Sequence, residues 1–347
     1  PDPALRGVAA QILGQIRPVR PEVVVALTKA VADAEAFVRD SATEALGEIG
    51  PEAAGAVTAL AARRGAKVIH WIQDIYPEIL AAHLGALAIP PLWPLRHRRD
   101  RAWQAAHRCV TLGEDMSRML ESRGVPPDRI GLVPNWAPRE LLTPAPVEAV
   151  AARRAAWGLV GKFVVTYSGN LGRVHEFAAV LAAAERLKSH RDIVFLFIGA
   201  GARFDEVRAT AQSRGLNNVR LLPPESRTDL AAALSTADAQ LVTLRPGFAR
   251  LVYPSKLAGV LAAGRPVLFV GPTDGEIARL LEREGCGAAF DPVDGTGLAA
   301  TIVTWHNDQA LCLQLGRRAR AIYERQFTFV TALARWNEIL RRTAAGS

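Results

Sequence analysis

Two short stretches of the chain combine glycine with charged or hydroxyl side chains, the residue types that bind phosphate groups. They are "YSGNLGRVHEF" (167–177) and "PSKLAGV" (254–260), and a third stretch, "FIGAG" (197–201), supplies glycines alone. Glycine lets the backbone turn sharply and approach a ligand closely, while Arg173 and Lys256 add positive charge. The first two stretches therefore predict contacts to a diphosphate. An ordinary turn with a surface arginine is the alternative for the first, and "FIGAG" alone is more typical of a plain tight turn.

Lys256 is more informative than an average lysine because of its expected place in a helix. Pro254 can begin a helix, so that Ser255 and Lys256 stand in its first turn. A lysine there opposes the helix dipole, and an external anion would remove the conflict. A solvated lysine is the alternative. Further along, Asp274 or Gly275 can cap the next helix, and this capping alone accounts for that segment.

The elements that must position these residues alternate regularly from about residue 160. Apolar runs predict strands at 163–167, 193–198, 219–222, 239–243 and 266–270, with helices at 175–189, 203–214, 226–236, 255–263 and 274–284. This alternation is typical of an α/β fold whose parallel sheet is covered on both faces. Ligands of such sheets bind at the carboxyl ends of the strands. The tail, 294–341, is predicted to be helical.

The preceding part of the chain is less regular. Residues 66–78, "AKVIHWIQDIYPE", predict a short buried strand at 68–72 followed by a polar loop. Residues 129–138, "RIGLVPNWAP", predict a second short strand. Between them we expect a helical region from about 78 to 124, interrupted by prolines. Residues 139–160 predict a linker and one helix.

The first segment is an internal repeat with a period of 33 residues. Its apolar positions have helical spacing, and the pattern resembles HEAT-type repeats, which stack helix pairs into solenoids. Two units are few for a solenoid, so we interpret the array as truncated at its start. The first copy contains Leu5, Arg6, Ala9, Leu13, Gly14, Ile16 and Pro18, and the second contains Val38, Arg39, Ala42, Leu46, Gly47, Ile49 and Pro51.

Composition indicates an ordinary globular protein of two domains. The chain has 347 residues, of which 50% are apolar and 22% charged. No stretch reaches the roughly 18 apolar residues of a membrane-spanning helix. Cys109, Cys286 and Cys312 lack metal-site spacing and favour a reducing cytoplasm. No signal peptide is recognised, although the chain starts at Pro1, so a lost targeting segment stays open.

The net charge of +8 is concentrated in one basic run, which contains Arg96, His97, Arg98, Arg99 and Arg101. A solvated helix face is one interpretation. Attraction to an anionic membrane or a phosphate-bearing acceptor is another, and we expect peripheral membrane contact through the four arginines. Nucleic acid is disfavoured because the run lacks interleaved aromatic residues and any accompanying motif.

Together these blocks resemble a known family. Residues 163–290 are similar to bacterial family-4 glycosyltransferases that assemble surface polysaccharides, especially the N-acetylfucosaminyl-transferase-like subgroup. The blocks are "YSGNLGRVHEF", "FLFIGAG", "PSKLAGVLAAGRPVLFVG" and "DGEIARLL". Three earlier blocks resemble the later part of the family's amino-terminal domain: "HWIQDIYPE" (70–78), "LGEDMSRMLESRGV" (112–125) and "VPNWAP" (133–138). The resemblance covers about 60 to 340.

The resemblance implies a two-domain (GT-B type) architecture with Rossmann-like sheets. We expect HEAT-like repeats at 1–58, a partial acceptor-side domain at 59–150, a complete nucleotide-sugar-binding domain at 151–325 and a carboxy-terminal helix at 326–347. It further implies a UDP-linked sugar donor as substrate, transfer with retention and no metal or other cofactor. The acceptor would be a polysaccharide or lipid-linked molecule at the inner membrane face.

The family's site residues carry over onto matching positions. Gln73 and Asp74 would face the reaction from the acceptor side, although Asp74 as a loop cap before Pro77 is an equal alternative. Arg173 and Lys256 would contact the diphosphate. The implied donor-binding set is Gly169, Asn170, Gly172, Arg173, Gly199, Gly201, Ser255, Lys256 and Glu276.

Two departures from the family pattern leave the activity open. Ala249 stands where family members generally carry a glutamate near the donor sugar, and Gly259 stands at a second glutamate position that the subgroup often lacks. The amino-terminal domain also lacks its first strands, which a fused or rearranged gene would explain. An active transferase and a non-catalytic nucleotide-sugar-binding protein with a helical-repeat interaction segment are both consistent with this. A nucleotide-sugar epimerase agrees less well with the blocks.

Overall fold

The computed structural model describes residues 2, 6, 8–10, 21–30, 33–35, 38, 41–42, 61, 65–85 and 89–345. The chain divides into two compact units. Unit 1 comprises Pro1–Thr111, Met116–Leu132 and Glu338–Ser347, and unit 2 comprises Leu112–Asp115 and Val133–Asn337. No helix of the described residues is long and apolar enough to cross a membrane.

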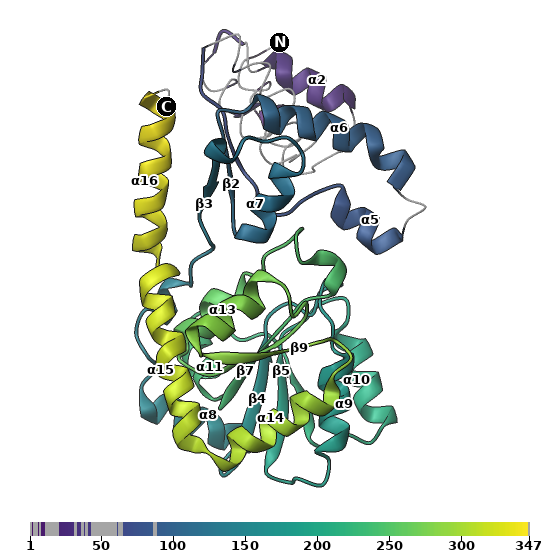
Figure 1. Cartoon of the computed structure of the whole chain (residues 1–347), viewed down its shortest axis with the longest axis vertical. Helices are drawn as coiled ribbons and strands as arrows, with labels where there is room; N and C mark the ends of the chain where they lie inside the picture. Colours follow the sequence, from purple (N-terminus) through teal and green to yellow (C-terminus); the bar gives the residue numbers. More distant parts are fainter. Residues whose placement is uncertain are drawn as a thin grey trace. The chain divides into compact units, whose positions relative to one another are not determined.

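Six parallel strands form the sheet of unit 2, in the order β6-β5-β4-β7-β8-β9 (Figure 1). The chain first builds the sheet outward from β4 to β6 and then returns to β7 on the other side of β4. This reversal makes the β4–β7 edge the topological switch point, where open α/β sheets bind ligands. The strands are β4 (Phe163–Ser168), β5 (Ile193–Ile198), β6 (Val219–Leu222), β7 (Ala239–Thr243), β8 (Val267–Val270) and β9 (Gly287–Phe290).

Helices cover both faces of this sheet, which explains why its central strands are continuously apolar. Alternate residues of β4 point to opposite faces: Tyr167 packs with α9 and α14, whereas Val164 packs with Ala233 of α11. The helices of unit 2 are α8 (Val147–Ala156), α9 (Ala178–Arg186), α10 (Phe204–Ser213), α11 (Leu230–Ser235), α12 (Lys256–Ala262), α13 (Glu276–Glu284), α14 (Gly295–Asn307), α15 (Gln309–Gln326) and the 3-10 turns η4 (Arg139–Leu141) and η5 (Pro246–Phe248). Helix α16 (Phe329–Ala345) begins in unit 2, and its residues from Glu338 onward belong to unit 1.

Unit 1 contains a three-stranded parallel sheet in the order β1-β2-β3. His70 pairs with Cys109 across the first ladder, and Val110 pairs with Gly131 across the second. The strands are β1 (Ile69–Trp71), β2 (Arg108–Thr111) and β3 (Ile130–Leu132). The described helices are α2 (Pro21–Ala30), α5 (Glu78–Leu84), α6 (Ile89–Ala105), α7 (Glu114–Glu121), whose first residues belong to unit 2, and the 3-10 turn η3 (Pro127–Arg129).

The predicted α/β class with parallel sheets is confirmed, and the five strands predicted after residue 160 agree with β4–β8 to within one residue. One prediction fails and one strand was not predicted. The region 78–124 is not wholly helical, because β2 lies inside it, and no local pattern in the sequence indicated β9. Strand β2 has only two apolar residues between polar ends, and β9, "GAAF", consists of small residues with weak strand preference. The proposed repeat falls mostly outside the described residues.

Candidate functional site

The ammonium group of Lys256 lies at the carboxyl end of β4, the switch-point edge of the sheet. Lys256 opens α12, as expected, and its Nζ donates a hydrogen bond to Oη of Tyr167. Nζ also lies 3.2 Å from Nε2 of His175 and 3.9 Å from the centre of the Tyr167 ring. Burial lowers the pKa of Lys256 to about 7, so an added anion would stabilise its charged form.

His175 and Tyr167 complete a hydrogen-bonded chain around Lys256. Nδ1 of His175 lies 2.7 Å from the carbonyl oxygen of Thr243, so Nδ1 carries the proton and Nε2 accepts from Lys256. Burial, assisted by the Lys256 charge, lowers the pKa of His175 to about 3 and keeps the ring neutral. The Tyr167 hydroxyl donates to the carbonyl of Asn170 over 2.8 Å. Two of the three Lys256 protons therefore face protein acceptors, which leaves one for a ligand.

The loops after β4 and β5 are held together, and their glycines make this contact sterically feasible. The N–H of Gly169 donates to Ile198 over 2.9 Å. A Cβ at Gly199 would lie 2.0 Å from the carbonyl oxygen of Gly169, and one at Gly201 would lie 2.3 Å from Oδ1 of Asn170. All three glycines have positive φ. Gly199 and Gly201 therefore support the β4 loop through close packing, in line with the plain-turn interpretation of "FIGAG".

The turn between β4 and α9 differs from the sequence expectation. Helix α9 begins at Ala178 rather than at 175, and Oε1 of Glu176 accepts the N–H groups of Phe177 and Ala178 at 2.9 and 3.0 Å. Glu176 thus engages the N–H groups of the N-cap residue Phe177 and of Ala178, the first residue of α9. Arg173 lies exposed in the preceding turn. Within the described part of the chain, no hydrogen bond uses the backbone N–H groups of Gly172 and Arg173.

The start of α13 is closed by a carboxylate from a distant segment. Gly275 occupies the N-cap position, but the acceptor is Asp115, whose Oδ2 receives the N–H of Glu276 over 2.7 Å. In return, the N–H of Asp115 donates to Oε2 of Glu276 over 3.2 Å, and Arg279 donates to Oδ1 of Asp115 over 2.8 Å. Burial raises the pKa of the Glu276 carboxyl above its usual value. Sequence reasoning missed Asp115, because capping was sought next to the helix.

Ala249, where the resemblance implies a glutamate, lines a small cavity of unit 2. Glu276, Asp115 and Tyr253 border the same cavity, so two carboxylates share it with Ala249. Ser255 is the exposed N-cap residue of α12, and its side chain makes no capping bond. Gly259 is buried, and a Cβ there would lie 3.3 Å from Leu141. A larger side chain at 259 would require Leu141 to move.

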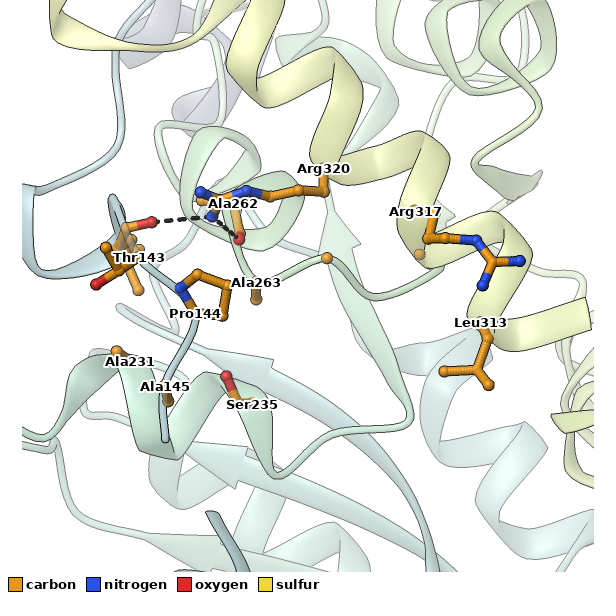
Figure 2. A pocket seen from close by; sticks show the side chains of 13 residues that line it. Thr143, Pro144, Ala145, Ala231, Ser235, Ala262, Ala263, Leu313, Arg317 and Arg320 are labelled. Atoms are coloured by element: carbon orange, nitrogen blue, oxygen red, sulfur yellow. Dashed lines mark hydrogen bonds between the residues drawn. The ribbon is translucent and has the colours of Figure 1, made fainter. Parts of the chain in front are cut away.

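A second cavity, of about 240 Å³, lies near the carboxyl end of α12 (Figure 2). The guanidinium of Arg320 crosses it and donates to the carbonyls of Ala262 (2.7 Å) and Leu141 (3.1 Å). Because Ala262 is followed directly by the turn into β8, this cavity lies toward the amino end of that strand. It is therefore separate from the carboxyl edge where Lys256 lies.

The other predicted site residues belong to unit 1. Gln73 and Asp74 follow β1 and have exposed side chains, and partial desolvation raises the pKa of the Asp74 carboxyl. Their catalytic role stays a prediction.

The basic run requires one correction, because Arg99 is buried. Its guanidinium contacts Glu78 at 2.9 Å and Asp100 at 2.6 Å and lies 4.0 Å over the Trp103 ring. The prediction that Arg99 contacts a membrane is therefore wrong, whereas Arg98 and Arg101 are exposed.

Comparison with known proteins agrees with the fold. Residues 151–322 match the family model described as Glycosyl transferases group 1. Residues 1–73 match a model of HEAT repeats, in agreement with the repeat pattern, and the end of this match overlaps β1.

Two curated relatives and one solved structure illustrate the likeness. "Probable glycosyltransferase WbjE" of Pseudomonas aeruginosa is 30% identical over 241 residues, which cover 69% of this chain and 59% of WbjE. WcaI of Escherichia coli (strain K12), named for a glycosyl transferase of colanic acid biosynthesis, is 29% identical over 194 residues, 55% of this chain and 47% of WcaI. The chain thus spans only about half of these relatives.

The crystal structure of HepE from Anabaena in complex with UDP has a TM-score of 0.71 at 16% identity, covering 84% of this chain and 76% of HepE. At this identity the likeness shows the fold alone, and that fold is the GT-B architecture that the sequence predicted. The finer subgroup of the family stays a prediction.

Proposed function

We propose that unit 2 binds a UDP-linked sugar at the carboxyl ends of β4 and β7. The observation that carries this proposal is the Lys256 ammonium group, which is held at the switch point by Tyr167 and His175 with one N–H left over. The printed title of HepE, a structure in complex with UDP, supports the same ligand class. The names of WbjE and WcaI support a glycosyltransferase, and the colanic acid biosynthesis in the name of WcaI supports a role in polysaccharide assembly.

The proposed reaction moves the sugar to a polysaccharide or lipid-linked acceptor with retention at the anomeric carbon. As the bond to the sugar breaks, negative charge develops on the departing diphosphate. Lys256, Arg173 and the backbone N–H groups of Gly172 and Arg173 would stabilise that charge, and no metal ion or other cofactor is part of the proposal. A lipid-linked acceptor would bring the protein to the inner face of the membrane.

A second candidate function is nucleotide-sugar binding without transfer. Ala249 favours it, because a missing donor-side carboxylate removes transition-state stabilisation of up to several kcal/mol. The carboxylates of Glu276 and Asp115 at the same cavity favour the transferase. The match of residues 1–73 to HEAT repeats is compatible with either function, because such repeats bind partners.

The first experiment measures ligand-induced stabilisation. UDP should raise the melting temperature of the full chain, and Arg173→Ala should abolish the shift. The matched control is Arg191→Ala, which removes another exposed arginine from the amino-end side of β5. If no nucleotide stabilises the chain, nucleotide binding is excluded.

The second experiment separates an enzyme from a binding protein. A panel of UDP-sugars is incubated with the full chain and a lipid-linked acceptor, and release of UDP and glycosylation of the acceptor are measured together. Turnover in the wild type establishes the transferase. UDP-sugar binding without turnover, combined with turnover gained in Ala249→Glu, would identify a binding protein that lost its catalytic carboxylate.

A further inference from the structure

The turn that follows β4, residues 170–175, has all of its backbone acceptors engaged and several of its backbone donors unused. Each of its six carbonyl oxygens accepts a hydrogen bond from another group of unit 2. In the part of the chain that the structure describes, no hydrogen bond uses the N–H groups of Asn170, Gly172, Arg173 and Val174. Backbone N–H groups without a protein acceptor suit an anion. The groups that engage the carbonyls therefore decide what the turn can bind.

One residue, Arg203 at the N-cap of α10, holds both ends of this turn. Its backbone N–H donates to the carbonyl of Leu171 over 3.0 Å, and its guanidinium donates to the carbonyl of His175. The guanidinium also lies 3.7 Å from the Glu176 carboxylate and 5.5 Å from the centre of the Phe177 ring. The side chain of Arg203 thus joins the end of the turn to α10, the helix that follows β5.

The other contacts of Arg203 keep it from binding a phosphate itself. Its Nε and Nη2 donate to the two carboxylate oxygens of Glu206 at 2.8 and 2.6 Å, a bidentate pair that fixes the plane of the guanidinium. Because Nη1 donates to His175, all three guanidinium nitrogens are engaged, and only 18% of the side chain is exposed. The hydrogen bond to Glu206 raises the pKa of Arg203, so its charge is retained. Arg203 is therefore placed to hold the turn rather than to contact a ligand.

Arg203 also offsets a negative charge beside the turn. The carboxylate of Glu176 would oppose an anion bound there, and its two oxygens lie 3.7 Å from Arg203 and 3.9 Å from Arg245. Arg245 engages two carbonyls of the turn as well: its backbone N–H donates to Val174 over 2.9 Å and its guanidinium donates to Arg173 over 3.4 Å. The side chain of Arg245 is 44% exposed, so Arg203 is the more firmly held of the two arginines.

We propose that Arg203 is a positioning residue, which holds the turn at 170–175 in the shape that a diphosphate contacts. It acts through Arg173 and the neighbouring N–H groups and does not touch the ligand. The proposal rests on the proposed function, because it takes the diphosphate of a UDP-linked sugar as the ligand of this turn. Without the guanidinium, the ligand would have to order the turn on binding, and that ordering would weaken the affinity.

The first measurement involves no nucleotide. Arg173 is exposed in the turn, so trypsin cleaves the bond from Arg173 to Val174 when the turn opens. We expect Arg203→Gln in the full chain to be cleaved at this bond about tenfold faster than the wild type, as followed by mass spectrometry. Arg203→Lys keeps the charge but lacks the planar fork, so its cleavage rate should lie between those of the wild type and Arg203→Gln.

The matched control is Arg208→Gln, on the same helix. Arg208 pairs with Asp205 at 3.3 Å and lies 4.8 Å over the Phe204 ring, so this substitution removes an ion pair and a ring contact but no contact to the turn. Its cleavage rate at Arg173 should stay within about twofold of the wild type, because an exposed ion pair contributes little. Melting temperatures are measured alongside, and cleavage is compared well below all of them.

The second measurement is UDP affinity by calorimetry. Arg203→Gln should bind UDP about tenfold more weakly than the wild type, Arg203→Lys should lose less, and Arg208→Gln should match the wild type. Saturating UDP should slow the cleavage of Arg203→Gln at Arg173 to the rate of the wild-type complex, because the bound diphosphate restores the turn. A residue that only stabilised α10 would leave the UDP affinity unchanged.

Two outcomes would overturn the proposal. One is equal cleavage at Arg173 in Arg203→Gln and the wild type, which would mean that the turn keeps its shape without this side chain. The other is faster cleavage with unchanged UDP affinity, which would mean that the ligand does not depend on the shape of the turn. Absence of UDP binding by the wild type would instead overturn the proposed function, and faster cleavage of Arg203→Gln would then still establish that Arg203 holds the turn.

Discussion

The carboxyl edges of β4 and β8 look alike in sequence and differ in structure. The loop after each strand contains glycine and leads to a helix, with Glu176 two residues before α9 and Glu276 as the first residue of α13. At β8, Asp115 and Arg279 close the helix start with protein groups. At β4, Lys256 has neutral partners only, Tyr167 and His175. The comparison teaches that the two edges differ in charge: carboxylates gather at the start of α13, whereas the β4 edge places Lys256 beside two neutral side chains and the neighbouring Glu176 engages the N–H groups at the start of α9.

The pKa shifts of Tyr253 at the β8 edge and of Lys256 at the β4 edge show the same difference in charge. Burial raises the pKa of the Tyr253 hydroxyl, and the negative charges of Glu276, Asp115 and Glu114 raise it further. That edge would repel an added diphosphate. The β4 edge instead holds a partly buried cation whose pKa is lowered by desolvation, so a diphosphate there would restore its charge.

The largest effect is expected for Gly199→Ala, which tests whether the β4 loop depends on the β5 loop. The new Cβ would meet the carbonyl oxygen of Gly169 at 2.0 Å, and φ at this position is +154°. We expect the free energy of unfolding to fall by about 3 kcal/mol. Urea unfolding measures it. The control is Gly247→Ala, where no atom lies within 4 Å of the added carbon. Equal stability of the two variants would contradict the described packing.

The next effect concerns Lys256→Met, which removes the cation but keeps the side-chain volume. We expect UDP to bind about thirtyfold more weakly, a loss of about 2 kcal/mol, because a charge-assisted hydrogen bond is removed. Stability without ligand should stay equal or rise, since no charge is then buried. Calorimetry of UDP binding measures the effect, with Lys162→Met at the other end of β4 as the control. If Lys256→Met bound UDP as tightly as the wild type, the donor site could not lie at the β4 edge.

A pH titration of UDP binding should show a smaller, graded effect. The pKa of Lys256 is about 7 in the free protein, and a bound diphosphate raises it, so binding takes up a proton. Affinity should therefore fall above pH 7 by up to about tenfold per pH unit, until the pKa of Lys256 in the complex is reached. His175, with a pKa of about 3, stays neutral over this range. If the UDP affinity of Lys256→Met still fell with rising pH, the proton taken up on binding would belong to a group other than Lys256.

The smallest effect is expected for Asp115→Ala at the β8 edge. The variant loses the cap on α13 and the ion pair with Arg279, whose exposed side chain weakens that pair by solvent screening. Unfolding free energy should drop by about 1 kcal/mol, while UDP affinity should change less than twofold. A tenfold loss of UDP affinity would show that both edges bind the donor and would end the contrast between them.

Much of unit 2 could be predicted because its signals are local. The bounds of β5, β6 and β7 match the expected ranges. The signal is strongest for β5, where every residue is apolar because the strand is buried on both faces, whereas the edge strand β6 is half-buried and includes Arg220. The helix start at Lys256 also follows from adjacent residues. Strand β2 escaped prediction because four residues with polar ends carry no periodic signal, and its burial depends on pairing with β1 and β3.

The sequence by itself determined the parallel α/β sheet and the basic residues Arg173 and Lys256, because periodicity and residue chemistry are written in neighbouring positions. The strand order, and with it the switch-point edge, came from the tertiary structure. Only the tertiary structure decided which polar groups are already engaged. Asp115 reaches Glu276 across 161 residues of chain, and His175 reaches Lys256 across 81. Arg99, which the sequence places among solvated arginines, is paired with Glu78 in the interior. Hydrogen bonds between distant segments leave no local trace in sequence, since the fold alone brings their partners together.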